Sequence, residues 1–460
     1  MRINKLIKTK YKTKINGIKT NSKDIKKGDL FVCTLGIIDK TNYIDDAIER
    51  GCSFVIANQN INNKVPFEKV DNLNLKRILD RFYNFPLSRI SLIGVTGTDG
   101  KTTITTILKD MTMGASIGTN GFNYDDKVIT LNNTTPSLDI VYECINDAIK
   151  NNKKNIFMEV SSESYLTKRI PNLFFDIGVF TNITKDHLDK HKDFNNYFNC
   201  KMKMLKNSNI VILNHDSKYF NKIRKVNTNY LTYGFKKSDI TIIDYRLYLD
   251  RTYIKFNYQD KDYNVISPLV GKYNIYNLMA CFLVILELNY NIEDVIKRVN
   301  LIKTIPGRNE IVYDKDFTVM IDHAHTACAT KNILRFVNNF KKRRLIVVVG
   351  CSGESYKEKR KVIGKFVLKY RDIVIFTMDD PREEDPNKII EDMLKSKRYY
   401  RKKYYKIIDR KLALKKAIRI AEEDDFILVL GRGRDSIMHL KEGDIIHSDY
   451  DELKKILQGY

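Results

Sequence analysis

The residues with the clearest chemistry lie at 94–103, where the sequence is Gly-Val-Thr-Gly-Thr-Asp-Gly-Lys-Thr-Thr. This run follows the apolar segment 90–93 and precedes an apolar pattern of helical period that starts near Ile104. A strand, a glycine-rich turn and a helix in that order are typical of a phosphate-binding loop. Compared with the general Walker pattern, Val95 stands where the first glycine is expected, and the spare glycine is Gly94. The sequence therefore predicts a variant phosphate-binding loop.

The side chains of this loop fit the triphosphate of ATP. Backbone N–H groups around Gly97 and Gly100 can surround phosphate oxygens at a helix N-terminus. Lys101 can reach the β- and γ-phosphates, and the Thr102 hydroxyl can hold Mg²⁺. The alternative is a turn without a ligand, but a lysine followed by two threonines at a helix start has no packing purpose. We expect the chain to bind ATP.

Further polar residues follow the next apolar strands. Glu159 ends a buried type of strand, where a carboxylate is costly unless it is paired or bound to a metal, so it is a candidate Mg²⁺ ligand. A structural ion pair is the alternative. His187 stands between Asp186 and Asp189 just past a strand end, which favours a metal or phosphate contact over the structural role of most single histidines. Taken alone, Lys201 would be a surface lysine.

Composition sets the general class of the protein. A length of 460 residues predicts about three domains, and 43% hydrophobic residues can fill more than one core. Met1 is not followed by an apolar signal segment, and the longest apolar run, 278–286, is far shorter than the ~20 residues that span a bilayer. The seven cysteines form no C-x-x-C pair, so we expect reduced thiols and no zinc site. These features predict a cytoplasmic globular protein.

The formal charge of +24 raises the question of nucleic-acid binding. The positive residues are spread along the chain, and they include basic runs such as 5–14 and 398–406. We interpret them as solvated faces and expect no nucleic-acid partner. Anionic substrates would still be attracted.

The pattern along the chain predicts three α/β units, at 1–88, 89–306 and 307–460. Apolar strands separated by amphipathic helices are typical of a largely parallel sheet that is covered on both faces. The first unit is small, the second contains the phosphate-binding loop, and the third is doubly wound without such a loop. Expected strands lie at 28–33, 53–57, 155–159, 175–181, 209–213, 317–321, 344–350, 372–377 and 425–431, with antiparallel strands within 241–265 and a helix at 44–50. Ligands in such sheets bind beyond the carboxyl ends of the strands.

Seven segments together resemble the Mur ligases in order and approximate spacing, over nearly the whole chain. They are 94–103, 158–162, 181–189, 269–274, 306–308, 322–326 and 379–382. Within the family the chain is similar to the MurE-type subfamily, which adds the third amino acid to UDP-N-acetylmuramoyl-L-alanyl-D-glutamate in peptidoglycan synthesis. The resemblance implies an N-terminal UDP-binding domain, a central ATP-binding P-loop domain and a C-terminal Rossmann-like domain that binds the amino acid, in a monomer.

The resemblance also implies roles for individual residues around ATP and magnesium. Lys101, Glu159, His187 and Lys201 would be catalytic, with Lys201 as a carbamylated lysine that supplies carboxylate-like oxygens to the metal beside Thr102, Glu159 and His187. Asn277 would lie on the adenine side, and Arg308 and Asp322 would close over the nucleotide with His325 nearby. The nucleotide-binding set is Gly97, Thr98, Gly100, Lys101, Thr102, Thr103, Asn277, Arg308 and Asp322.

A second implied set binds the other two substrates. Ser22, in a segment similar to the family's uracil-binding motif, would contact the UDP end. The muramoyl-dipeptide would contact Asn133, Thr134, Thr135, Ser161 and Arg169, and the amino acid would contact Asp379, Asp380, Arg382, Gly431 and Asp435. The threonine-rich loop also has a plain structural alternative as the N-cap of a helix, a role that Ser137 could fill.

Two residues bear on which amino acid is added. Arg382 is the residue expected for meso-diaminopimelate, because a guanidinium can bind the distal carboxylate through two hydrogen bonds. Asp380, in place of the family's asparagine, is instead typical of lysine-adding relatives. We expect diaminopimelate first, L-lysine second and another diamino acid last. The sequence also departs from the family pattern at Glu163, Thr167, His323, Arg434 and Asp435.

In the implied reaction, the γ-phosphoryl group passes to the side-chain carboxylate of D-glutamate, and the amine of the amino acid attacks the resulting acyl phosphate. Two other functions remain open. Another amide ligase of the superfamily, such as a folylpolyglutamate or cyanophycin synthetase, is disfavoured by the motif at Ser22 and by 379–382. A nucleic-acid-linked P-loop ATPase is disfavoured by the absence of a clustered basic strip.

Overall fold

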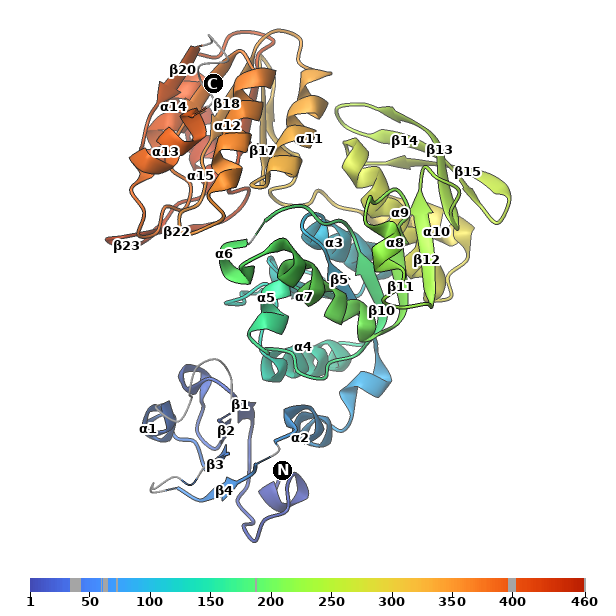
Figure 1. Cartoon of the computed structure of the whole chain (residues 1–460), viewed down its shortest axis with the longest axis vertical. Coiled ribbons are helices and arrows are strands. Elements are labelled where there is room, and N and C mark those ends of the chain that lie inside the picture. The colour runs from blue at the N-terminus through green and yellow to red at the C-terminus, as the bar shows by residue number, and fades with distance from the viewer. Residues whose placement is uncertain are drawn as a thin grey trace.

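The computed structural model describes residues 1–33, 43–58, 60, 65–71, 73–186, 188–395 and 403–458. Three sheets follow one another along the chain, and Figure 1 shows them as three successive bodies, with the N-terminal strands at one end and the C-terminal sheet at the other. The first sheet has the order β1-β2-β3-β4, and its neighbouring strands are parallel. Its elements are β1 (Ile18–Lys19), β2 (Leu30–Val32), α1 (Ile44–Glu49), β3 (Phe54–Ala57), β4 (Phe67–Lys69) and α2 (Leu75–Phe82).

The central sheet has the order β15-β14-β13-β12-β11-β10-β5-β9-β6-β7-β8. Its middle strands are parallel, whereas the pairs β13–β14, β14–β15, β6–β7 and β7–β8 are antiparallel. The strands are β5 (Ser91–Thr96), β6 (Ala115–Gly118), β7 (Gly121–Tyr124), β8 (Lys127–Ile129), β9 (Asn155–Glu159), β10 (Phe175–Phe180), β11 (Ser208–Asn214), β12 (Tyr230–Gly234), β13 (Ile240–Leu247), β14 (Thr252–Tyr258) and β15 (Lys261–Ser267).

Helices cover both faces of this sheet. One core contains the apolar residues of α3 and α9, and the other contains those of α4 and α7. The apolar run at 278–286 lies in α9, which is buried on nearly all sides, as expected for a helix without a polar face. The helices are α3 (Lys101–Thr112), α4 (Leu138–Lys150), α5 (Ser162–Leu166), α6 (Leu188–His191), α7 (Phe194–Lys206), α8 (Phe220–Ile223), α9 (Lys272–Glu287) and α10 (Ile292–Arg298).

The C-terminal sheet has the order β16-β17-β21-β18-β19-β20 and is parallel except for β16. Helices α11, α12 and α13 contribute to the core on one face, and α14 and α15 to the core on the other. The strands are β16 (Glu310–Asp314), β17 (Thr318–Asp322), β18 (Leu345–Val349), β19 (Ile373–Phe376), β20 (Lys403–Lys406) and β21 (Phe426–Leu430), with the hairpin β22 (Ile437–Leu440) and β23 (Gly443–Ile446). The helices are α11 (Ala327–Asn338), α12 (Glu358–Tyr370), α13 (Pro386–Leu394), α14 (Arg410–Arg419) and α15 (Asp449–Leu457).

The structure confirms the predicted α/β class, with a mixed central sheet that contains the glycine-rich loop and a doubly wound C-terminal sheet. The predicted strands at 155–159, 175–181 and 425–431 match β9, β10 and β21 to within a residue at each end. The limits 1–88, 89–306 and 307–460 stay a prediction. Within the described residues, no helix has the length and apolar character that crossing a membrane would require.

Candidate active site

The glycine-rich loop joins β5 to α3 at the carboxyl edge of the central sheet. Gly100 has a φ of +89°, a conformation that favours glycine, and an added Cβ there would lie 2.8 Å from Oδ1 of Asn277. The Lys101 ammonium donates hydrogen bonds to the carbonyl oxygens of Gly97 and Thr98, at 3.1 and 2.9 Å. The loop thus holds its lysine over its own turn, and Asn277 of α9 lies directly against it.

Glu159 ends β9, which is the neighbour of β5 in the sheet. Its side chain is buried, and its carboxylate accepts hydrogen bonds from the Thr102 hydroxyl at 3.0 Å and from the Thr119 N–H at 2.8 Å. A buried carboxylate and a hydroxyl beside a phosphate-binding loop form the oxygen donor set that Mg²⁺ prefers, so these residues fit the metal. His187 lies outside the described residues.

The segment after β10 fixes the other side of the loop. The Thr181 hydroxyl donates to the Asp99 carbonyl at 2.6 Å, and the Asp99 N–H donates to Oδ1 of Asn182 at 3.0 Å. The Thr184 N–H donates to the Thr98 hydroxyl oxygen at 3.0 Å. These bonds fix the loop to the segment that follows β10.

Lys201, on α7, is buried behind the loop and not at the surface. Its ammonium donates to the Gly97 carbonyl at 2.7 Å and lies 4.7 Å from the centre of the Tyr197 ring. Burial, with a smaller contribution from the Lys101 ammonium, holds the pKa of Lys201 well below its usual range. A histidine that the sequence did not single out, His191, is buried nearby and hydrogen-bonds the Ser162 hydroxyl at 2.9 Å.

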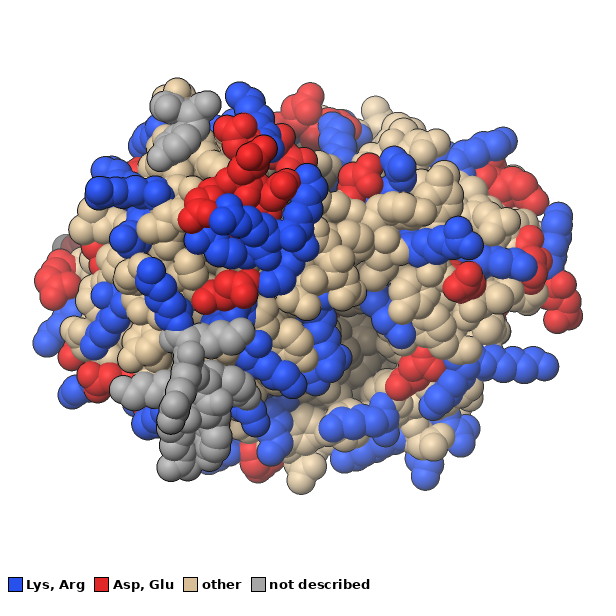
Figure 2. All heavy atoms as spheres, turned by 90° about the horizontal axis from the view of Figure 1, so that it is seen from above, with Lys and Arg blue, Asp and Glu red and all other residues tan. Residues whose placement is uncertain are grey.

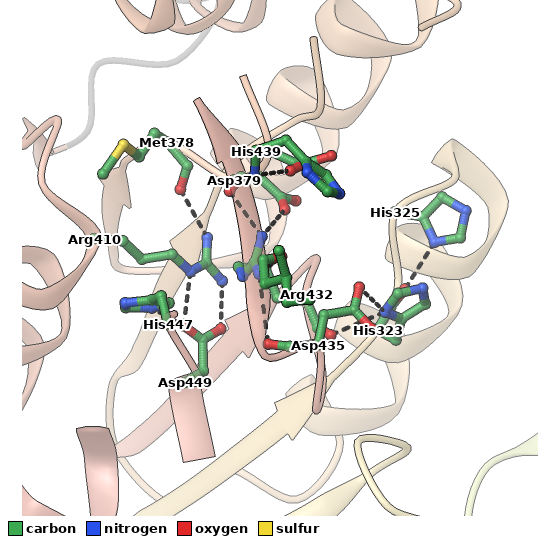
Figure 3. Close-up of polar contacts among 12 residues, drawn as sticks. His323, His325, Met378, Asp379, Arg410, Arg432, Asp435, His439, His447 and Asp449 are labelled. Atoms are coloured by element: carbon green, nitrogen blue, oxygen red, sulfur yellow. Dashed lines mark hydrogen bonds and ion pairs between the residues drawn. The ribbon is translucent and has the colours of Figure 1, made fainter. Parts of the chain in front are cut away.

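The C-terminal sheet supplies a second group of polar residues, drawn in Figure 3. Gly431 lets the chain approach Asp379 closely, since an added Cβ would lie 2.3 Å from Oδ2 of Asp379. Arg432 is buried and donates to the carbonyl oxygens of Asp379 at 2.9 Å and Ile437 at 2.7 Å. Arg432 thus joins the loops after β19 and β21, a structural role that the sequence did not reveal.

Arg382 and Asp380 lie at the edge of this group. Nε of Arg382 donates to Oδ2 of Asp380 at 3.2 Å, and the backbone N–H of His439 donates to Oδ1 of the same carboxylate at 2.8 Å. The Arg382 side chain is 45% exposed, whereas Asp380 is 17% exposed. A half-exposed guanidinium held by one carboxylate keeps free N–H donors for a ligand.

The departures from the family pattern have clear structural partners. Nδ1 of His323 lies 3.0 Å from the Arg432 carbonyl and 3.7 Å from Oδ2 of Asp435, and burial lowers the pKa of His323 to about 3. Arg434 forms an ion pair with Glu310, whose Oε2 also accepts the Gly307 N–H at 2.8 Å. The loop 431–435 is therefore tied to the segment that enters the C-terminal sheet.

The threonine-rich loop, which contains Asn133, Thr134 and Thr135, contacts the end of β9. Thr135 is buried and donates to the Glu159 carbonyl at 2.9 Å, while Ser161 caps α5. Arg169 lies 4.0 Å from Glu163, which also pairs with Lys190 at 2.8 Å.

One cavity of about 1560 Å³ joins most of these groups. Figure 2 shows a hollow in the surface with Lys and Arg side chains gathered around its rim, which suits an anionic ligand. The expected site residues that line the cavity are Thr98, Gly100, Lys101, Thr102, Thr103, Asn133, Thr134, Glu159, Ser161, Arg169, Asn277, Arg308, Asp322, Asp379, Asp380, Arg382, Gly431 and Asp435. Gly97, Thr135 and Lys201 lie behind this lining, and Ser22 is buried in the first unit, away from it.

The C-terminal unit packs against the loop itself. The Thr326 hydroxyl donates to the Asp99 carboxylate at 3.1 and 3.2 Å. Asp322 is buried and accepts hydrogen bonds from the N–H groups of Asn309 and Ala324, both at 2.8 Å, and burial raises its pKa. The glycine-rich loop and the loop that contains Arg382 thus line a single cavity.

A P-loop with a magnesium-compatible carboxylate, facing a second α/β unit across one cavity, is an arrangement that suits an ATP-dependent ligase. Two family models match the chain, the Mur ligase middle domain over 95–285 and the Mur ligase, glutamate ligase domain over 307–433. The chain belongs to the Mur ligase family.

Relatives and solved structures agree with this assignment. The UDP-N-acetylmuramoyl-L-alanyl-D-glutamate--2,6-diaminopimelate ligase of Aquifex aeolicus (strain VF5) is 35% identical, over 97% of this chain and 94% of the relative. The enzyme of the same name from Clostridioides difficile (strain 630) is 34% identical, over 94% of this chain and 92% of the relative.

Among solved structures, a UDP-N-acetylmuramoyl-L-alanyl-D-glutamate--2,6-diaminopimelate ligase superposes with a TM-score of 0.69 at 21% identity, covering 100% of this chain and 99% of the other. The MurF ligase of Thermotoga maritima in complex with ADP gives 0.66 at 19% identity, covering 97% of each chain. These two likenesses show the shared fold.

Proposed function

We propose that this enzyme joins a diamino acid to UDP-N-acetylmuramoyl-L-alanyl-D-glutamate in peptidoglycan synthesis, with 2,6-diaminopimelate as the amino acid. The names of the relatives support both substrates. The observation that carries the proposal is the shared cavity, in which Lys101 and Glu159 face Asp379, Asp380 and Arg382.

In the proposed reaction, the bond from the γ-phosphorus to ADP breaks as a bond to the side-chain carboxylate of D-glutamate forms. The amine of the amino acid then attacks the acyl phosphate, and phosphate leaves with the electron pair. Lys101 would exchange the carbonyls of Gly97 and Thr98 for phosphate oxygens. Thr102 and Glu159 would hold Mg²⁺, which neutralises charge on the phosphates when bound. The chain supplies positioning and charge. Closure of the C-terminal unit over the site would keep water from the acyl phosphate.

Lys201 would be a carbamate in this proposal, with His187 and Glu159 as further metal ligands. A buried lysine with a lowered pKa has a larger fraction of neutral amine, and that amine can add to carbon dioxide with loss of a proton. The product is an anionic oxygen ligand in place of a cation. Support for this role comes from the position of Lys201, directly behind Gly97 and close to the Lys101 charge.

L-lysine is a second candidate for the incoming amino acid. Arg382 keeps free donors for a distal carboxylate, which favours diaminopimelate. The Asp380 carboxylate, 3.2 Å from Nε of Arg382, would instead favour the distal ammonium of L-lysine. We place diaminopimelate first because the relatives are named for it and because an arginine is a poor neighbour for an ammonium.

The remaining site residues complete the proposal. Asn277, Arg308 and Asp322 would surround the nucleotide. Asn133, Thr134, Thr135, Ser161 and Arg169 would contact the muramoyl-dipeptide, and Gly431 and Asp435 the amino acid. Ser22 would contact the uracil end from the unit at 1–88. We propose a cytoplasmic monomer without a nucleic-acid partner.

An omission experiment tests the proposed function. The purified enzyme is incubated with ATP, Mg²⁺, UDP-N-acetylmuramoyl-L-alanyl-D-glutamate and meso-diaminopimelate, and ADP and the tripeptide product are measured by mass spectrometry. We expect product only in the complete mixture. ADP formation that depends on folate and glutamate instead of the UDP-substrate would support the folylpolyglutamate alternative and contradict the proposal.

A further inference from the structure

Lys359 is a buried lysine on the cavity wall that the mechanism above does not use. It lies in the first turn of α12, its side chain is 7% exposed, and it lines the cavity. Within the described part of the chain, its one ion-pair partner is Asp186, with Nζ 3.6 Å from Oδ1. That distance is longer than a normal hydrogen bond. A buried ammonium held only at this distance is incompletely satisfied, so the site favours a further anion.

The position of Asp186 brings Lys359 to the phosphate side of the cavity. Asp186 follows Thr184 by two residues, and the Thr184 N–H is bonded to the Thr98 hydroxyl of the glycine-rich loop. On the other side, Thr326 of the C-terminal unit is bonded to Asp99 of the same loop. Lys359 of the C-terminal unit and Lys101 of α3 therefore line the same cavity, and Lys359 lies beside the segment that is bonded to the loop.

Two neutral groups lie beside Lys359. Burial lowers the pKa of His325 to about 3, and the nearby His323 and the Lys359 ammonium lower it further, so the imidazole is neutral. Cys351 also lies near Lys359, and burial raises its pKa to about 12, so the thiol is neutral as well. Asp186 is the negative group that faces Lys359, and a bound phosphoryl group would compete with it.

We propose that Lys359 is a second phosphate-binding lysine, which turns from Asp186 to the γ-phosphoryl group when ATP and the UDP-substrate are bound. This inference rests on the proposed function. In the step concerned, ADP leaves with the electron pair of the broken phosphorus–oxygen bond as the carboxylate oxygen of D-glutamate bonds to phosphorus. The Lys359 side chain offsets the charge on the equatorial phosphoryl oxygens. The first chemical step would thus require the C-terminal unit to be in place.

Positional isotope exchange in ATP separates a role of Lys359 in phosphoryl transfer from a role in binding or adding the amino acid. ATP labelled with ¹⁸O at the β,γ-bridge is incubated with the UDP-substrate and Mg²⁺ but no amino acid, so that scrambling of the label reports reversible acyl phosphate formation. The variants are Lys359→Met, Lys359→Arg and a matched control, Lys361→Met, in which an exposed lysine of the same helix is changed. Circular dichroism and thermal unfolding check that each variant is folded.

We expect Lys359→Met to slow both exchange and ligation about 100-fold or more, with the KM for the amino acid little changed. Lys359→Arg should retain about a tenth of the exchange rate or more, and Lys361→Met should match wild type. Exchange at the wild-type rate in Lys359→Met, whether or not ligation is slowed, would overturn the inference. Failure of the wild-type enzyme to ligate would count against the proposed function instead.

Discussion

At the scale of single residues, charged side chains of the cavity lie within hydrogen-bonding distance of neutral protein groups. Lys101 is bonded to two carbonyl oxygens, and Glu159 has hydrogen-bond donors as its neighbours in place of a lysine or arginine. A charged ligand can replace these hydrogen bonds at a small cost in free energy, because the side chains are already oriented and little reorganisation is needed on binding. Replacing single side chains therefore tests their roles directly.

Replacement of Lys101 by alanine should lower the turnover number 100-fold or more. One preorganised charge contact to a transferring phosphoryl group supplies about 3 to 4 kcal/mol. The rate of ADP release in the complete ligation mixture is the measurement, and Lys150→Ala, at the exposed end of α4, is the control. A near-normal rate for Lys101→Ala would remove the phosphate-binding assignment.

Lys201→Ala should be nearly inactive and should recover part of its activity when short carboxylates such as acetate are added. The small acid can occupy the vacated space and supply the oxygen ligand that a carbamate would provide. Lys201→Arg is the informative comparison, because arginine preserves the positive charge but does not form a carbamate. Equal activity of Lys201→Arg and wild type would exclude the carbamate.

Arg382→Ala should lower kcat/KM for meso-diaminopimelate about 30-fold to 1000-fold and leave the KM for ATP almost unchanged. Loss of a charge-assisted, partly buried contact costs on the order of 2 to 4 kcal/mol. Steady-state kinetics with each substrate varied in turn gives both values. If wild type prefers L-lysine and Arg382→Ala keeps that preference, Asp380 becomes the residue that selects the amino acid.

At the scale of elements, the sequence predicted where several strands end. It did not predict which distant residues pack beside those ends. The apolar runs that end at Glu159 and Phe180 are local, so the periodicity located β9 and β10 to within a residue at each end. The hairpin of β22 and β23 was missed, because it is short and most of its residues are exposed, which leaves no apolar alternation to detect. Buried Arg432 was also missed, since its partners lie in loops distant in sequence.

The ion pair between Arg360 and Glu384 predicts how the stability of the fold depends on pH. Arg360 of α12 donates to both carboxylate oxygens of Glu384, at 2.9 and 3.0 Å, and this hydrogen bonding lowers the pKa of Glu384 from 4.5 to about 2. Because the folded-state pKa is lower than the unfolded one, the pair stabilises the fold above about pH 4.5. That stability is lost as the pH falls toward 2.

We therefore expect Glu384→Gln to lower the free energy of unfolding by roughly 2 kcal/mol at pH 7 and by less than half as much at pH 3. Urea unfolding of wild type and variant at the two pH values gives the four free energies of unfolding to be compared. A difference between the two proteins that is the same at pH 3 and pH 7 would show that the Glu384 charge does not stabilise the fold.

At the scale of the whole molecule, the residues of the proposed site come from two units that the sequence separates by about half the chain. The P-loop and the resemblance together predicted that ATP and the amino acid would meet, but the contacts that bring them together depend on tertiary packing. Thr326 on Asp99 and Lys359 near Asp186 each join residues more than 150 positions apart. No periodicity or spacing in the sequence predicts such pairs.

We propose that one cavity couples ATP to the addition of diaminopimelate. The most direct measurement is a competition in which ATP, the UDP-dipeptide, meso-diaminopimelate and L-lysine at equal concentrations are mixed with the enzyme. Mass spectrometry then quantifies both tripeptide products against the ADP formed. We predict that the diaminopimelate product predominates and that one ADP appears for each product molecule. ADP formation without either product, or a predominance of the lysine product, would contradict this account.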